Sequence, residues 1–299
     1  MSKISYNITD KEKGLKLRSF LKEELKLSSR FMRGAACSNR VFVNGKVVNL
    51  IYILKAGDKV EIELEKEESQ NIEPEEMNLA IVYEDEDIIL VNKPIGMVVH
   101  PTKNYQLGTL SNGLLYHFKK NGENCIVRLV SRLDMNTSGL VIIAKNQFSH
   151  MALARDLHEL TSYEKSYVAV IHRKMKDSEG TIDLPIMREL ETSIKRVVDE
   201  KGQKSVTHYK VLETFKDAQL LKLTLETGRT HQIRVHLSHL GNPIYGDTLY
   251  GIDGDEEYIG RQALHAYRLV FPHPRTGKVI EVETEIPEDI KALIELVRK

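Results

Sequence analysis

From residue 79 onward, short apolar segments of β character follow one another, and most are separated only by turns. Hairpin-like pairs are expected at 79–83 with 88–91, at 207–214 with 220–226, and at 265–271 with 279–284. A doubly wound parallel sheet needs a helix between consecutive strands, and this spacing does not supply one. The sequence therefore predicts an α+β fold built on one large mixed, mostly antiparallel sheet.

Helices are expected at few places in this region. Thr109 is placed to cap a helix that runs to His117, and Asn146 to cap one that runs to His158. A third helix is expected from Thr230, and the chain is expected to end in a helix with Pro287 in its first turn. Further strands are expected at 127–130, 140–144 and 166–171.

The first 65 residues have a different pattern. Leu17, Leu21 and Leu25 recur at four-residue spacing, which predicts an amphipathic helix. Ser28 or Ser29 is placed to cap a second helix. Asn44-Gly45 between β-forming residues predicts a tight hairpin, and another strand is expected at 59–64. The sequence predicts a small helix–helix–hairpin unit.

Charge is segregated along the chain, although the net charge is zero. Residues 1–50 carry 11 Lys and Arg against 4 Asp and Glu, whereas residues 51–100 carry 4 against 13. We therefore expect a basic domain at 1–65, an acidic linker at 66–78 and a main domain at 79–299. On charge alone, the basic segment is either an RNA-binding surface or a solvated helical face.

Several classes of protein are excluded by composition. The two cysteines, Cys37 and Cys125, lie far apart, which argues against a disulfide framework and an all-cysteine zinc site. No apolar run approaches 18 residues, and the first residues lack a signal-peptide segment, so we expect no membrane span and a cytoplasmic location.

Residues 128–145 contain the most informative loop. Asp134 lies in a polar stretch between two apolar strands, with Arg132 two residues before it and Thr137-Ser138-Gly139 after it. The carboxylate either faces a cleft or bonds nearby amides in an Asx turn. A metal site is not expected, because the spacings of His231, His236 and His239 do not match a helical zinc pair.

This loop resembles the signature loop of RluA-type pseudouridine synthases, which runs His-Arg-Leu-Asp-x-x-Thr-Ser-Gly-Leu. Arg132, Leu133, Asp134 and the run from Thr137 to Leu140 match, and Ser131 stands where the family has histidine. Three more segments resemble the family in its order, at 88–101, 164–171 and 225–247. The chain is most similar to the RluD-like branch.

The resemblance implies that uridine in structured RNA, most of all large-subunit ribosomal RNA, is isomerised to pseudouridine. It implies that Asp134 is catalytic, that Tyr167 contacts the uracil and that Arg229 pairs with Asp134. We further expect Arg132 to fill the space that the extruded base leaves. We expect a monomer that uses neither a cofactor nor a metal.

The first 65 residues resemble the S-four RNA-binding domain. The resemblance lies in the leucine-containing helix and in two segments, LSSRFMRGAACSNRVFVNGKVV and LKAGDKVEIEL. The second helix departs from the usual pattern at Gly34, Ala35 and Ala36, and Asn39 stands where glycine is usual. Gly34 is expected to cost about 1 kcal/mol of helix stability relative to alanine.

Two other functions stay open at this point. In the first, the chain is an RNA-binding or assembly factor whose large domain is inert. In the second, it is a carboxylate-dependent nucleoside hydrolase or glycosylase that releases free uracil. For the isomerase itself, the sequence leaves open whether Asp134 attacks as a nucleophile or removes a ribose proton.

Overall fold

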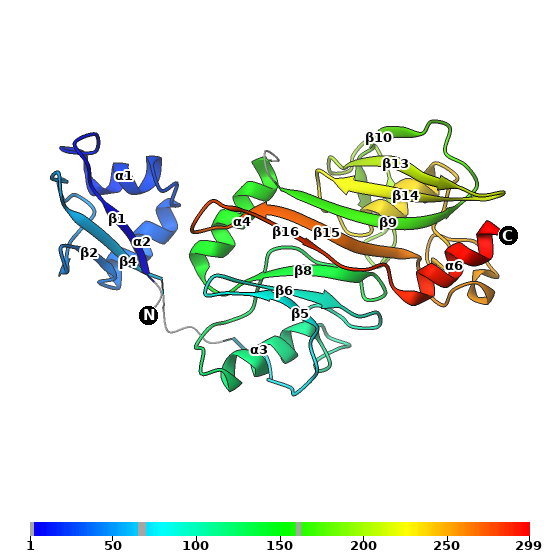
Figure 1. Cartoon of the computed structure of the whole chain (residues 1–299), viewed down its shortest axis with the longest axis horizontal. Coiled ribbons are helices and arrows are strands. Elements are labelled where there is room, and N and C mark those ends of the chain that lie inside the picture. Colours follow the sequence, from blue (N-terminus) through cyan, green and yellow to red (C-terminus); the bar gives the residue numbers. More distant parts are fainter. Residues whose placement is uncertain (1–2, 65–69, 160–162) are drawn as a thin grey trace.

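The computed structural model of the chain describes residues 3–64, 70–159 and 163–299. Figure 1 shows a small N-terminal body beside a larger one. The expected linker lies partly outside the described residues, since 65–69 are not among them. No helix in the described residues has both the length and the apolar character that a membrane crossing requires.

The small body consists of a four-stranded sheet and two helices. The strands lie in the order β1-β4-β2-β3. Its elements are β1 (Lys3–Asn7), α1 (Leu17–Glu23), α2 (Ser29–Cys37), β2 (Val41–Val43), β3 (Lys46–Val47) and β4 (Lys59–Glu63). The hairpin is confirmed, because Asn44 and Gly45 both adopt positive φ, 51° and 76°. Ser28 caps α2 by accepting a hydrogen bond from the Phe31 amide. Strand β1 was not expected.

The large body is built on a ten-stranded sheet. Its elements are β5 (Ile81–Glu84), β6 (Ile88–Lys93), α3 (Leu110–Lys120), β7 (Arg128–Leu129), β8 (Ser138–Ala144), α4 (Gln147–Glu159), β9 (Glu164–His172), β10 (Glu179–Asp183), β11 (Ile186–Arg188), β12 (Arg196–Val198), β13 (Val206–Thr214), β14 (Ala218–Leu225), α5 (Gln232–His239), η1 (Asp255–Glu257), β15 (Leu264–Pro272), β16 (Val279–Glu283) and α6 (Glu288–Arg298).

The sheet runs in the order β10-β13-β14-β9-β15-β8-β6-β5, with β16 on β15 and β7 on β8. Its strand pairs are antiparallel apart from β15 with β8, which is parallel. The predicted α+β fold with a mostly antiparallel sheet is confirmed. Strands β10, β11 and β12 were not expected, and β11 and β12 form a separate two-stranded hairpin.

The centre of the sheet is buried on both faces. On β6, Ile89 and Val91 pack in the core that contains α3, while Ile88 and Leu90 pack in the core that contains Leu153 of α4. Strands covered on both faces are apolar at consecutive positions rather than alternating. The apolar runs of β6 and β8 thus fix where the functional loop between β7 and β8 emerges.

The parallel pair explains a glycine that follows this loop. Gly139 pairs with Ala266 of β15 and has φ +114°. A Cβ at this position would lie 2.2 Å from the Ala266 carbonyl oxygen. The close approach and the positive φ together require glycine. The end of the loop is therefore fixed by the backbone rather than by side-chain packing.

The described part of the acidic linker is attached to the large body. Gln70 exchanges two hydrogen bonds with the backbone of Val127, and the Asn112 side chain donates to the Glu73 carbonyl. The Glu75 carboxylate accepts from the Gly108 amide at 2.6 Å. Residues 70–78 of the expected linker are thus attached to the large body by hydrogen bonds to residues in and beside α3.

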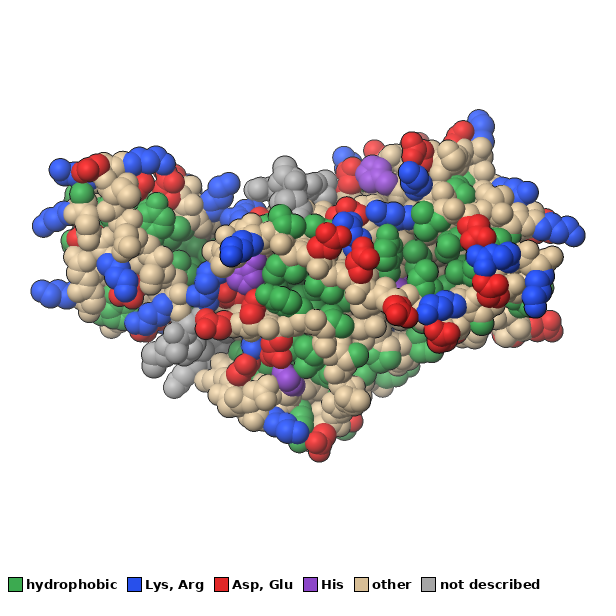
Figure 2. Space-filling view, in the orientation of Figure 1, with side chains coloured by type: hydrophobic (Ala, Val, Ile, Leu, Met, Phe, Trp, Pro, Cys, Tyr) green, Lys and Arg blue, Asp and Glu red, His purple; other side chains and the backbone are tan. Residues whose placement is uncertain are grey.

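The small body contacts α4. Phe148 belongs to the small body's hydrophobic core, and Met151 packs against that core. The Arg275 side chain also donates to the Lys3 carbonyl. Lys and Arg side chains are spread around the small body in Figure 2. The Ser28 amide donates to Met151 Sδ at 3.3 Å. The two bodies therefore touch through apolar side chains of α4 and through hydrogen bonds at Met151 and Arg275.

Candidate active site

The loop between β7 and β8 directs three consecutive side chains into different surroundings. Arg132 is exposed, Leu133 is buried in the main core, and the Asp134 side chain is 27% exposed. The Thr137 amide donates to the Asp134 carbonyl, which closes the turn after the acid. Because Leu133 anchors the loop from within, the Asp134 carboxylate is held at the wall of a cleft.

Lys93 fixes the same loop through hydrogen bonds to backbone carbonyls. Its Nζ donates to the carbonyls of Pro94, Met97 and Met135 at 2.8–2.9 Å. Burial lowers the pKa of Lys93 to about 7, although the charge of Asp134 opposes the shift. Met135 directly follows Asp134. The lysine therefore ties the turn after β6 to the backbone next to the carboxylate.

A buried arginine pairs with Asp134. Arg234 of α5 donates from Nη1 to Asp134 Oδ2 at 2.9 Å, and from Nε and Nη2 to both oxygens of Asp247. Burial alone would lower the pKa of Arg234, but Asp247 and Asp134 outweigh it and the pKa is raised. The bidentate bond to Asp247 sets the plane of the guanidinium. The arginine consequently presents one fixed N–H to Asp134.

The expectation that Arg229 pairs with Asp134 is wrong. Arg229 is exposed, and its Nε donates to the Lys204 carbonyl at 3.2 Å. It lies in the turn before α5, where its amide donates to the Gln232 side chain. Arg234 lies in the first turn of the buried helix and faces inward. The helix therefore delivers the second arginine of the segment to the carboxylate, not the first.

Helix α5 also begins later than expected. His231, not Thr230, is the N-cap residue, and it has φ 59° with no side-chain cap. Its Nε2 lies 3.9 Å from Asp134 Oδ2, and its Nδ1 bonds the Tyr250 hydroxyl. Burial lowers the pKa of His231, although Asp134 opposes this shift. The unusual backbone at this residue brings the imidazole to the cleft.

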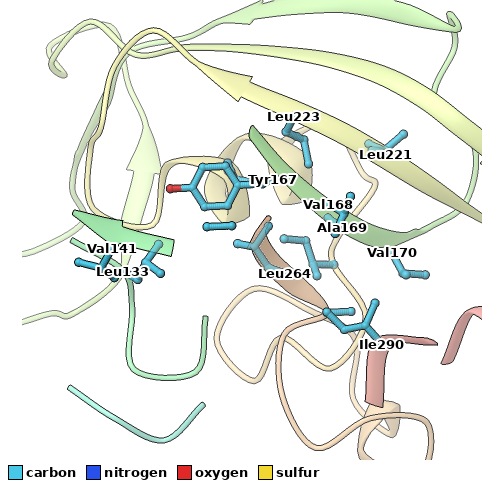
Figure 3. Packing of buried hydrophobic residues seen from close by; sticks show 14 of the residues in the cluster. Leu133, Val141, Tyr167, Val168, Ala169, Val170, Leu221, Leu223, Leu264 and Ile290 are labelled. Atoms are coloured by element: carbon cyan, nitrogen blue, oxygen red, sulfur yellow. The ribbon is translucent and has the colours of Figure 1, made fainter. Parts of the chain in front are cut away.

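Two tyrosines line the cleft beside the acid. Tyr167 of β9 is 5% exposed, and Figure 3 shows its ring against aliphatic side chains, with its hydroxyl on the side away from Val170. Tyr163 is also buried, and burial raises the pKa of both phenols. These aromatic faces provide an apolar surface against which a base can lie.

Lys165, which lies between these tyrosines in the sequence, is a buried cation. It is 5% exposed, and its Nζ lies 5.3 Å from the centre of the Tyr167 ring. The Nζ donates to Ser131 Oγ at 3.2 Å. Burial lowers the pKa of Lys165 to about 8, against the opposing effect of Asp134. Within the described part of the chain, no carboxylate forms an ion pair with this ammonium.

One cleft of about 760 Å³ is lined by Asp134, Tyr163, Lys165, Tyr167, His231 and Arg234. The volume lies within the range of small-molecule sites, large enough for a nucleotide. Arg132 and Arg229 lie at its rim, and Arg132 Nη2 is 3.5 Å from Thr230 Oγ1. The cleft thus combines a carboxylate with a fixed arginine partner, an apolar aromatic wall and a buried ammonium.

Potential metal ligands meet elsewhere in the described residues. Asp85, Asp87 and His273 place ligand atoms within 4.8 Å of one another. Asp87 is already bonded by Arg275, Asn146 and Ser149, so its oxygens serve the packing of α4 and the turn after β15. This group does not line the cleft.

Sequence reasoning missed Arg234, Lys165 and Lys93. One signal for Arg234 was present, because it is flanked by Ile233 and Val235 in a helix and a buried arginine needs a carboxylate partner. Asp247 lies 13 residues later in the same segment. The sequence indicates the burial of the two lysines less clearly, because the burial of a strand residue depends on which strands lie beside it.

Comparisons with known proteins identify the family of the chain. Residues 87–239 match the family model described as RNA pseudouridylate synthase. The chain is 41% identical to the Bacillus subtilis protein named uncharacterized RNA pseudouridine synthase YlyB, covering 100% of this chain and 99% of that protein. It is 38% identical to ribosomal large subunit pseudouridine synthase D of Pasteurella multocida, covering 87% of this chain and 84% of that protein.

A solved structure shows the same fold. The structure of human RNA pseudouridylate synthase domain containing 1 superimposes with a TM-score of 0.56 at 28% identity, covering 74% of this chain and 95% of that one. The four motifs, the cleft and these similarities agree. The chain belongs to the RNA pseudouridylate synthase family, as an RluA-type, RluD-like RNA pseudouridine synthase, and is therefore an isomerase.

Proposed function

We propose that this synthase isomerises uridine in large-subunit ribosomal RNA and that Asp134 is the carboxylate that acts on the substrate. One observation carries the assignment of Asp134. It is the acid of the signature loop, it faces the cleft, and Arg234 holds its Oδ2 at 2.9 Å. The substrate is supported by the relatives that are named for the large ribosomal subunit.

The reaction breaks the bond between uracil N1 and ribose C1′ and joins C1′ to C5. The electron pair of the broken bond passes to the uracil, and the C5 proton is lost after the new bond forms, while N1 is protonated. Asp134 acts on the sugar or the ring as a nucleophile, or as a base towards a ribose proton. Both routes need a carboxylate held in a fixed direction, and the hydrogen bond from Arg234 fixes that direction.

The uracil must stay in the cleft while it is detached and turned. Tyr167 supplies a buried ring for this contact, and Lys165 supplies an ammonium close to it. A cation there stabilises the negative charge that the uracil carries after N1–C1′ cleavage. Ser131 accepts a hydrogen bond from Lys165 and orients it.

The target base must first leave its stack in the folded RNA. Arg132 projects from the loop next to Asp134 and is exposed at the rim of the cleft. We assign it the space that the base vacates, together with a phosphate contact. Arg229, also at the rim, is assigned to substrate binding without contact to Asp134.

The N-terminal body is assigned to sequence-tolerant binding of the same RNA, as an S-four-like domain covering residues 1–65. Its α2 carries Arg30 and Arg33, both exposed. Isomerisation conserves atoms and electrons, so the proposal includes no cofactor and no metal. We also propose that the protein is a monomer and lies in the cytoplasm. Mass measurement in solution tests the first point, and cell fractionation tests the second.

Replacement of Asp134 by asparagine tests the assignment. We expect Asp134→Asn to lower single-turnover formation of pseudouridine by several powers of ten while RNA affinity changes by less than about tenfold. Turnover above about 1% of wild type would refute the role of Asp134. The wild-type product must keep the mass of the RNA, because a glycosylase would release free uracil.

The substrate is tested separately in cells. Pseudouridines in large-subunit ribosomal RNA are mapped with the gene present, deleted and restored as Asp134→Asn. We expect specific sites to be lost on deletion and not regained with the variant. An unchanged ribosomal map, with altered sites in another RNA, would contradict the ribosomal assignment alone.

A further inference from the structure

A second hollow adjoins the cleft. It has a volume of about 480 Å³ and is lined by β11, β12, the turn at 201–203 and the turn at 228–230. Arg132, Arg229 and Thr230 line both hollows. We call the second hollow the hairpin groove. A polymeric ligand that extends from the cleft past Arg132 enters the hairpin groove directly.

The hairpin groove is strongly basic. Five of its eleven lining residues are cationic and none is Asp or Glu, the five being Arg132, Arg188, Arg196, Lys201 and Arg229. The whole protein has no net charge, so this concentration is local. A concave surface of one sign raises the local concentration of counter-charged groups.

The guanidinium groups are oriented by backbone rather than by acids. Arg188 Nη1 donates to the Glu191 carbonyl at 2.9 Å, and Arg196 Nη1 donates to the Ile194 and Lys195 carbonyls at 3.0 and 3.1 Å. In the described chain, none of the five cations forms an ion pair with a carboxylate. Their charge is held in place without being neutralised.

The tip of the same hairpin has a second unusual property. Leu190 and Ile194, in the turn between β11 and β12, are 64% and 71% exposed. Two large aliphatic side chains on an exposed turn beside uncompensated arginines fit a partner that has both phosphates and apolar flat faces. Proteins insert leucine and isoleucine between bases in this way. Unstacked RNA next to the target nucleotide has this chemistry.

We propose that the hairpin groove binds the sugar-phosphate backbone of the RNA that flanks the target uridine, with the aliphatic tip of the hairpin against an adjacent base. The inference rests on the proposed RNA substrate. It gives a partner of the right charge to Arg229, which lines both hollows and donates from Nε to the Lys204 carbonyl. The flanking phosphates, held on one side of the cleft, then set the position of the RNA relative to the cleft.

The test removes the charge of the groove in the full-length protein. The groove variant is Arg188→Gln/Arg196→Gln/Lys201→Gln. The matched control is Lys174→Gln/Lys176→Gln/Lys216→Gln, which removes three exposed cations that line neither hollow. Affinity for a ribosomal RNA fragment and for a uridine-rich single strand is measured between about 50 and 200 mM salt.

Each lost phosphate contact should reduce the slope of log affinity against log salt by roughly 0.7–0.9. We expect the groove variant to lose about two units of slope and bind at least tenfold more weakly, with its single-turnover rate at saturation within about threefold of wild type. The variant Arg188→Lys/Arg196→Lys keeps the positive charges, so it should have most of the wild-type salt slope. A slope equal to that of the control would overturn the inference.

The tip is tested by Leu190→Ser/Ile194→Ser. Loss of an apolar contact releases no counterions, so affinity should fall about fivefold or more with an unchanged slope. Wild-type affinity would refute the tip contact. These experiments measure RNA binding, so their outcome is distinguishable from failure of the proposed function. If the wild-type protein formed no pseudouridine but its salt slope still depended on the groove cations, the proposed catalysis would be contradicted and the groove assignment would stand.

Discussion

Two kinds of arginine lie near the cleft, and they differ in burial and in the groups that bind the guanidinium. Arg234 is buried, and its guanidinium is fully engaged by Asp247 and Asp134. Arg188 and Arg196 lie in the hairpin groove, where their guanidinium groups bond only backbone carbonyls among the described residues. A neutralised buried arginine holds a reacting group in position, whereas an uncompensated exposed one attracts an anion. Arginine count alone does not reveal which role applies.

Among the tests of this comparison, the largest effect is expected between Arg234 and Arg229. Arg234→Lys loses the fork that grips Asp247 while it directs one N–H to Asp134. We expect single-turnover rate at saturation to fall by about 10²-fold, since displacing a reacting group by about 1 Å costs that much. Arg229→Lys is the matched control, and its rate at saturation should change little. Equal losses in both variants would remove the distinction between the two groups.

The next effect concerns Lys165, a cation in the cleft that pairs with no carboxylate of residues 3–64, 70–159 and 163–299. Lys165→Met removes the charge that we assign to the detached uracil. The rate should fall on the order of tenfold, less than the 10²–10³ for a dedicated oxyanion donor, because other groups share the charge. An undiminished single-turnover rate would show that the ammonium does not act on the reaction.

The pH dependence of the same step provides a second reading of Lys165. Its pKa is lowered to about 8, so the charged form is present below about pH 8 and is lost as pH rises through that value. The wild-type rate should therefore decline above about pH 8, and this decline should be missing in Lys165→Met. Lys93, His231, Asp134, Arg234 and the two tyrosines also surround the site, so the comparison of the two profiles is the measurement.

A smaller effect is expected in the N-terminal body. Arg30→Gln/Arg33→Gln removes two exposed cations of α2, and each lost phosphate contact should flatten the salt slope by roughly 0.9 or less. Turnover at saturation should not change. Lys11→Gln is the control, because Lys11 already pairs with Glu24. A changed turnover in the double variant would indicate that this body does more than bind RNA.

The smallest effect is expected for Ser131→Ala. The variant removes one hydrogen bond from Lys165, worth about 1 kcal/mol, or roughly a fivefold lower single-turnover rate. Kinetics at saturating RNA measure this loss. A loss as large as that of Lys165→Met would mean that Ser131 itself contacts the substrate.

The sequence by itself determined the type of sheet and the position of the family's signature loop. Apolar runs separated by turns identify antiparallel strands because side-chain periodicity and turn residues are local properties. The loop around Asp134 was recognisable for the same reason, since all its matching residues are contiguous. The caps at Ser28 and Asn146 were likewise predictable from a few neighbouring residues.

Only the tertiary structure decided which charged side chains meet. Arg229 and Arg234 are five residues apart and chemically identical, and the choice between them depends on where α5 begins and on Asp247 folding back beneath it. Burial of Lys165 depends on the strands beside β9, and the hairpin groove on two short strands without strong periodicity. These contacts join residues that are distant in sequence, so local sequence patterns do not predict them.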